Sequence, residues 1–293
     1  MINRMTKPTP KTLQVFLPEG TPAGIQIAEL TTRIVQAISV PRTHLKQFFE
    51  RPESQHVGTY FLFGGEDDGS KPLAYIGQTE NLKQRLKSHD ANKEFWTRAV
   101  ILVSRTQSFT QAHIKWLEWQ SIAKAKAANR FKLENGDSGS EPFVTEAILA
   151  EVEEIFETGS LLLQSLGYPI FEPLISRKIE GTEDDEDTWY LSIRDTDAKA
   201  RFGDSGFVVL KGSVCSRDIT PHALEAPFAR KREKMVEDGI IKEANERLVF
   251  AEDFNFNSPS GASCVLSGRH TNGWVDWKNA DGKSLKEVKR DGE

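Results

Sequence analysis

Two short runs that each contain a tyrosine decide the fold of this chain: Gly58-Thr59-Tyr60-Phe61-Leu62-Phe63 and Leu73-Ala74-Tyr75-Ile76-Gly77. The residues between them are mostly glycine and acidic, so the two runs predict a β-hairpin closed by a turn. Downstream, the apolar spacing predicts a helix over 79–89, a strand over 99–103 and a helix over 110–128. This order predicts an α+β fold, in which a small antiparallel sheet is flanked by helices.

The length of 293 residues predicts two compact units, because single domains mostly hold about 100–200 residues. The strongest break is the acidic run Glu183–Asp187, whose like charges repel one another and predict a solvated linker. The strand-like and helical runs beyond it predict a second α+β unit. The expected segments are an N-terminal extension at 1–55, a core domain at 56–135, a helical connector at 136–180, the linker at 181–188 and an accessory domain at 189–293.

Three local predictions concern the later segments. The connector is expected to hold a helix over 144–166 that is interrupted near Gly159. A returning strand is expected over 168–175. In the accessory domain, Asn272-Gly273 is expected to form a hairpin turn.

The charge is spread unevenly along the chain. The formal net charge is −5, yet residues 71–132 hold 12 lysines and arginines against 4 acidic residues. Residues 133–187, by contrast, hold 2 against 15. A basic window attracts phosphates through counterion release, although many basic stretches are only solvated helix faces. The window at 71–132 contains the second tyrosine run and both predicted helices, so it is the candidate nucleic-acid interface.

Three polar residues on the predicted helices could carry chemistry. The helix over 79–89 would bring Arg85 back beside the sheet, with His89 one turn further along the same face. The second helix carries Glu118 within an apolar stripe whose members are Ile114, Leu117, Ser121, Ile122 and Ala125. A carboxylate in such a stripe is costly unless it is paired or bound to metal. Glu118 is therefore expected either to form an ion pair, for example with Arg85, or to hold a metal ion.

Together, Gly58-Thr59-Tyr60, Tyr75-Ile76-Gly77, Asn81–Arg85 and the helix that bears Glu118 resemble the GIY-YIG nuclease superfamily. The arginine eight residues after Gly77 makes the match specific. Thr59 stands in place of the usual isoleucine, a mild departure because both residues are β-branched. The loop between the tyrosine motifs is longer than usual. The resemblance covers under a third of the chain.

This resemblance implies a metal-dependent endonuclease that hydrolyses phosphodiester bonds, with DNA as the expected substrate and RNA left open. It implies catalytic roles for Tyr60, Tyr75, Arg85 and Glu118. One of the tyrosines, preferentially Tyr60, would help to deprotonate water, and Arg85 would stabilise the phosphate. Mg²⁺ or Mn²⁺ on Glu118 would stabilise the leaving oxygen.

The expected nucleic-acid contacts are Lys83, Lys87, His89 and Asn129. The later asparagine of the family corresponds to Asn129 or Asn135, and spacing does not decide between them. The alternative function is a non-catalytic DNA-binding or regulatory protein that keeps the nuclease fold, and a structural interaction module is a third. Metal-dependent cleavage of nucleic acid separates these functions.

The C-terminal stretches Ser258–Ala262 and Asn272–Lys278 resemble an uncharacterised domain family that often follows GIY-YIG modules. Similar patterns occur in domains associated with restriction-modification systems, which implies sensing of DNA or of modified bases. An equally good interpretation is that Trp274 and Trp277 are core aromatic residues beside the predicted turn.

Cysteine usage and hydropathy indicate the compartment. Cys215 and Cys264 lie far apart in the sequence and outside any Cys-x-x-Cys cluster, which argues against structural zinc and a disulfide framework. No apolar run reaches the roughly 18 residues that cross a bilayer. We therefore expect a cytoplasmic protein with no membrane partner.

Overall fold

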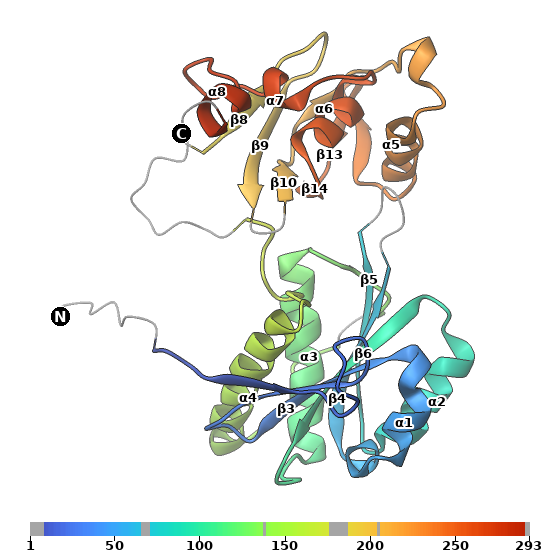
Figure 1. Cartoon of the computed structure of the whole chain (residues 1–293), viewed down its shortest axis with the longest axis vertical. Helices are drawn as coiled ribbons and strands as arrows, with labels where there is room; N and C mark the ends of the chain where they lie inside the picture. The colour runs from blue at the N-terminus through green and yellow to red at the C-terminus, as the bar shows by residue number, and fades with distance from the viewer. Residues whose placement is uncertain (1–8, 66–70, 137–138, 176–186, 204–205, 291–293) are drawn as a thin grey trace, which may run out of the picture. The chain divides into compact units, whose positions relative to one another are not determined.

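The computed structural model describes residues 9–65, 71–136, 139–175, 187–203 and 206–290 (Figure 1). Its contacts divide the chain into two compact units. Unit 1 holds residues 9–65 and 72–171, and unit 2 holds the described residues from Glu172 onward together with Lys71. Most of the predicted linker at 181–188 lies outside the described residues, as does the centre of the turn between the two tyrosine runs.

Unit 1 is built on one seven-stranded sheet with the order β1-β2-β3-β6-β4-β5-β7. Neighbouring strands are antiparallel except for β5 and β7, which are parallel. The predicted hairpin is confirmed, because β4 pairs with β5 and places Tyr60 opposite Gly77. The strands are β1 (Leu13–Phe16), β2 (Gln26–Leu30), β3 (Val35–Pro41), β4 (Gly58–Gly64), β5 (Leu73–Thr79), β6 (Trp96–Ser104) and β7 (Lys132–Leu133).

Helices cover both faces of this sheet, as Figure 1 shows. One face carries α3 (Gln111–Ala128) and α4 (Glu146–Ser165), and the other carries α1 (Leu45–Glu50) and α2 (Leu82–Asn92). Short 3-10 helices occupy Arg42–His44 and Pro52–Gln55.

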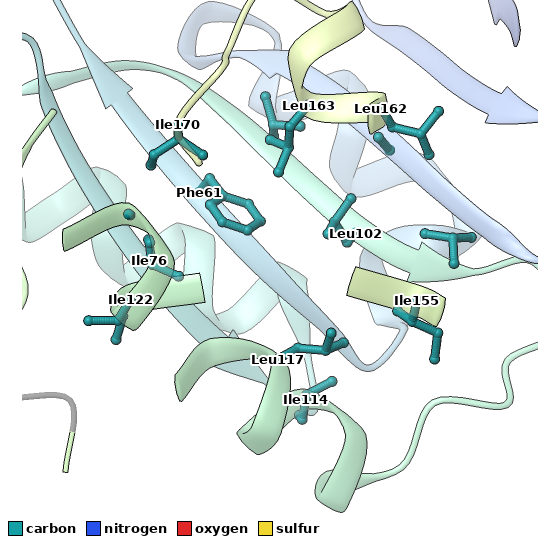
Figure 2. Close-up of a cluster of buried hydrophobic side chains, with 14 of the residues drawn as sticks. Phe61, Ile76, Leu102, Ile114, Leu117, Ile122, Ile155, Leu162, Leu163 and Ile170 are labelled. Carbon is teal, nitrogen blue, oxygen red and sulfur yellow. The ribbon is translucent and has the colours of Figure 1, made fainter. Parts of the chain in front are cut away.

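The strand β4 supplies both cores, since successive side chains of a strand point to opposite faces. Phe61 packs in the cluster on the α3 side, which Figure 2 shows together with Ile76 and Leu117. Tyr60 and Leu62 pack in the cluster on the α2 side. A tyrosine hydroxyl is thereby placed on the α2 face, inside an otherwise apolar layer.

Two predictions for the connector are wrong. α4 runs without interruption through Gly159, where an added Cβ would lie 2.6 Å from Leu102 Cδ1. The glycine therefore allows α4 to pack closely on β6 and does not end the helix. Residues 168–175 form turns instead of the predicted returning strand. Their apolar character reflects packing, because Ile170 is fully buried in the core (Figure 2).

Unit 2 is a second α+β unit around its own core. It contains a four-stranded sheet with the order β14-β10-β9-β8 and a three-stranded sheet with the order β11-β13-β12, both antiparallel. The strands are β8 (Trp189–Leu191), β9 (Ala198–Gly203), β10 (Gly206–Val209), β11 (Val214–Cys215), β12 (Ile241–Ala244), β13 (Arg247–Phe250) and β14 (Phe254–Phe256). The helices are α5 (Pro227–Glu237), α6 (Pro259–Ser267), α7 (Gly273–Asp276) and α8 (Leu285–Lys289), and a 3-10 helix spans Pro221–Ala223.

The dipeptide Asn272-Gly273 begins α7, so the predicted hairpin turn is wrong. The side chain of Asn272 caps the helix by accepting a hydrogen bond from Trp274 N at 3.2 Å. An added Cβ on Gly273 would lie 2.3 Å from Pro259 O, and the buried Trp277 Nε1–H donates to the same carbonyl at 3.1 Å. The two C-terminal stretches therefore contact each other, and Trp277 is a core residue of unit 2.

Candidate active site

The structure brings Tyr60, Tyr75, Arg85 and Glu118 together beside β5. They come from β4, β5, α2 and α3, in that order along the chain. α2 begins just after β5 because Asn81 Oδ1 accepts a hydrogen bond from Gln84 N at 2.9 Å and caps the helix. This early start turns Arg85 back toward the sheet, as the sequence predicts.

Tyr60 is the buried centre of a hydrogen-bonded chain. Arg85 Nε–H donates to Tyr60 Oη at 2.8 Å, and Tyr60 Oη lies 2.8 Å from His89 Nε2. Because the oxygen accepts from Arg85, its own proton is free to be donated to His89. We therefore assign to His89 the neutral tautomer with an unprotonated Nε2.

The surroundings of this pair favour neutral groups. Burial raises the pKa of Tyr60 above its usual value, although the hydrogen bond from Arg85 opposes the shift. Burial, followed by the charges of Arg85 and Lys93, lowers the pKa of His89 to about 4. His89 therefore stays neutral near pH 7 and can accept a hydrogen bond from the tyrosine hydroxyl. The sequence interpretation placed His89 on the Arg85 face of the helix but missed this partnership.

Gly77 makes the approach of Tyr60 to β5 possible. An added Cβ at this position would lie 2.3 Å from Tyr60 Oη and 2.5 Å from Tyr60 Cζ. No side chain larger than hydrogen fits there while the tyrosine keeps its position. The glycine of the Tyr75-Ile76-Gly77 run therefore forms one wall of the tyrosine pocket.

Arg85 and Tyr75 form the outer part of the site. Arg85 is exposed. Its hydrogen bond to Tyr60 is the largest cause that raises the pKa of the guanidinium, and its hydrogen bond to Tyr75 adds a smaller effect. Burial lowers the same pKa and opposes both. Tyr75 is half-buried and stacks on Tyr60 with the ring centroids 6.3 Å apart. Solvent thus reaches Arg85 and Tyr75, whereas Tyr60 is 0% exposed.

Glu118 lies on α3, on the opposite side of β5 from α2, and its side chain is half-buried. Burial raises the pKa of its carboxyl group, while a hydrogen bond from the Gln78 backbone and the charge of Arg85 oppose the shift. Among the described residues no ion pair joins Glu118 to Arg85, so the expected pairing is not formed, although the two groups interact electrostatically. The carboxylate keeps free acceptor positions beside the arginine.

Asn135 reaches β5 through its side chain. The Asn135 side chain accepts from Ile76 N at 2.9 Å and donates to Ile76 O at 2.7 Å. It thereby continues the pairing of β7 along the outer edge of β5. Asn129 ends α3 in the left-handed conformation, with φ of 52°, so its position is set by a helix terminus.

The expected contacts Lys83 and Lys87 lie away from these residues. Lys83 Nζ donates to Phe49 O at 3.1 Å, and Lys87 Nζ lies 5.5 Å from the centroid of the Phe49 ring. Both side chains are directed to α1. The cation that does reach the site is Lys93, whose Nζ lies 4.5 Å from the centroid of the Tyr75 ring. The sequence interpretation missed it, although its spacing continues the series of Arg85 and His89.

The donor set suits a metal that keeps most of its water ligands. In the described part of the chain, no group of three or more His, Cys, Asp or Glu side chains is arranged to hold an ion. Glu118 offers a carboxylate, with one backbone donor already bound to it. A single carboxylate with open positions fits Mg²⁺ or Mn²⁺, which bind water and phosphate oxygens in addition to protein ligands. Glu118 would hold such an ion.

None of the helices in the described ranges is long and apolar enough to cross a membrane.

Comparison with protein families finds one match within each unit. Residues 56–135 match the family described as the GIY-YIG catalytic domain, and residues 189–289 match the family described as a domain of unknown function (DUF4357). The predicted resemblance is confirmed for both segments. Among curated proteins and among solved structures, none matches the chain. The first match indicates the nuclease superfamily, whose members act on nucleic acid and generally depend on a divalent metal.

Proposed function

We propose that this protein is a metal-dependent endonuclease that hydrolyses phosphodiester bonds in DNA, with the reaction carried out by unit 1. One observation carries the proposal: the exposed Arg85 guanidinium contacts both tyrosines beside the Glu118 carboxylate. Phosphodiester hydrolysis needs a proton acceptor for water, a cation at the phosphate and a metal at the leaving oxygen. Tyr75, Arg85 and the metal ligand Glu118 offer a group for each of these three roles.

Arg85 is the phosphate-binding cation of the proposed reaction. Its Nε–H is fixed by Tyr60, so the orientation of the planar guanidinium is set before substrate binds. The remaining N–H groups are presented to solvent beside Tyr75. A fixed fork of donors stabilises the charge that develops on the phosphate oxygens without reorganisation during the reaction.

The two tyrosines take different roles because their access to solvent differs. Tyr75 is half-buried and lies at the exposed arginine, so we assign to it the contact with the attacking water. Tyr60 is 0% exposed and holds Arg85 and His89 in place through its hydroxyl group. This assignment reverses the preference for Tyr60 that the family resemblance alone suggests.

Glu118 is the proposed metal ligand. A divalent ion bound there would stabilise the departing 3′ oxygen and would favour the ionised form of the carboxylate. The Gln78 backbone holds the carboxylate at β5, close to Arg85. The position of Glu118 is therefore fixed by the same strand that carries Tyr75.

The test is cleavage of supercoiled plasmid, branched DNA and RNA by the full-length protein with Mg²⁺, with Mn²⁺ or with a chelator. We expect metal-dependent cuts by the wild-type protein and none by Glu118→Gln, which keeps the shape of the side chain and removes its charge. Circular dichroism and thermal unfolding of the variant should stay close to wild type. Binding of DNA without cleavage under any of these conditions would support the non-catalytic alternative instead.

A further inference from the structure

The end of α2 places one more cation at the proposed site. Lys93 is the residue at which α2 ends, and its backbone N–H is held by His89 O at 2.9 Å. Its ammonium group lies over the face of the Tyr75 ring, 4.5 Å from the centroid, and the side chain is only half-buried. A cation over an aromatic face is attracted by the ring quadrupole, so Lys93 is held in place while its charge stays accessible.

Arg85, His89 and the helix-terminal Lys93 form a single stripe toward the tyrosines. Arg85 and His89 are spaced four residues apart, which places them one above the other on a helix face, and Lys93 follows as the extended residue that ends the helix. Arg85 and His89 contact Tyr60, and Lys93 contacts Tyr75. The first and last members of the stripe are cationic, and the neutral His89 lies between them.

The two cations contact different parts of the Tyr75 side chain. Arg85 hydrogen-bonds to Tyr75, and the ammonium group of Lys93 lies over the ring face, 4.5 Å from the centroid. Two charges at different parts of one side chain suit contacts to two neighbouring phosphates of a strand. Among the described residues, no carboxylate forms an ion pair with Lys93.

We propose that Lys93 binds a phosphate of the nucleic-acid strand next to the phosphate that Arg85 contacts, and so fixes the register of the strand across Tyr75. This inference rests on the proposed nuclease function and adds a substrate-binding residue to it. The class of ligand is a phosphodiester backbone, because an ammonium group reads charge and not base identity. Loss of Lys93 should therefore weaken binding of all sequences alike.

The test measures binding separately from cleavage. In full-length Glu118→Gln protein, which we expect to bind without cutting, the affinity for a fluorescent DNA duplex is measured between about 50 and 200 mM salt. Lys93→Met removes the charge and keeps the length of the chain, and Lys87→Met is the matched control because Lys87 lies over Phe49 on the same helix. One phosphate contact contributes about 0.9 to the slope of log affinity against log salt, or about 3-fold over this range.

We expect Lys93→Met to lose that part of the slope, Lys87→Met to keep it and Lys93→Arg to restore it. With Glu118 intact, Lys93→Met should raise KM and leave kcat nearly unchanged. Equal slopes for Lys93→Met and Lys87→Met, in a protein that binds and cleaves DNA, would overturn the assignment of Lys93 alone. A fall in kcat with an unchanged slope would overturn it too, because Lys93 would then act through Tyr75. A wild-type protein that neither binds nor cleaves nucleic acid would instead defeat the nuclease function itself.

Discussion

Replacing Gly77 by alanine tests whether the hydroxyl of Tyr60 is held where the site needs it. The added methyl group would lie 2.3 Å from Tyr60 Oη, far below an ordinary contact, so the phenol would have to move by about 1 Å. Tyr60 is fully buried and has hydrogen bonds of 2.8 Å to both Arg85 and His89. Any such movement would stretch both bonds.

The cost follows from these contacts. Overpacking a buried position costs about 1–3 kcal/mol. The hydrogen bond of Tyr60 with the charged Arg85 contributes about 1.5–3 kcal/mol, and the one with the neutral His89 contributes about 1 kcal/mol. With partial relaxation, Gly77→Ala should destabilise unit 1 by about 3–5 kcal/mol. Gly65→Ala is the matched control, because nothing lies within 4 Å of its added Cβ.

Native-state hydrogen exchange of peptides from β4 and β5 reports the stability of this unit in the full-length chain. The same measurement is made in a Tyr60→Leu background, where the side chain ends before the atoms that clash. Gly77→Ala should cost less than about 1 kcal/mol there, and the difference between the two backgrounds is the coupling between glycine and tyrosine. Equal costs in both backgrounds, or a cost no larger than that of Gly65→Ala, would refute the reasoning.

Three further predictions concern single groups. Arg85→Lys should lower kcat/KM by about 100-fold or more, because lysine keeps the charge but loses the fork of donors, and near-normal turnover would show that charge alone suffices. His89 should titrate near pH 4 in histidine NMR spectra. As pH falls from 6.5 toward 4, unit 1 should lose up to about 3 kcal/mol of its free energy of unfolding, because the unfolded chain binds a proton at His89 before the folded chain does. His89→Gln should abolish this pH dependence. Asn135→Ala should speed exchange of the Ile76 amide and cost about 2 kcal/mol, and an unchanged exchange rate would show that β5 does not depend on this side chain.

The sequence predicts the hairpin, the two flanking helices and the position of Arg85, because each depends on local pattern. Tyr60 and Gly77 are opposite residues of adjacent strands, and Asn81 is a side-chain cap that starts α2 at a fixed point. Local chemistry of this kind is visible in the residue order.

Other features depend on packing and escape a local reading. The rotation of α2 directs Lys83 and Lys87 to Phe49, which no count of charges reveals. The contact of Asn135 with Ile76 depends on the parallel pairing of β7 with β5, a contact between distant parts of the chain. Gly159 resembles a helix breaker until the close approach of Leu102 explains it.

The outer edge of β5 has a consequence for contact between molecules. The backbone groups of β5 that point away from β4 already have hydrogen-bond partners. Glu134 N–H donates to Ala74 O, and the Asn135 side chain binds both Ile76 N–H and Ile76 O. The Glu118 carboxylate accepts a hydrogen bond from the Gln78 backbone. A foreign strand that approached this edge would find these hydrogen-bonding positions filled. The strand that carries Tyr75 is therefore protected from edge-to-edge aggregation by the same carboxylate that we assign to the metal. A charge-removing change at Glu118 would weaken that protection, so such variants should be assayed at low protein concentration.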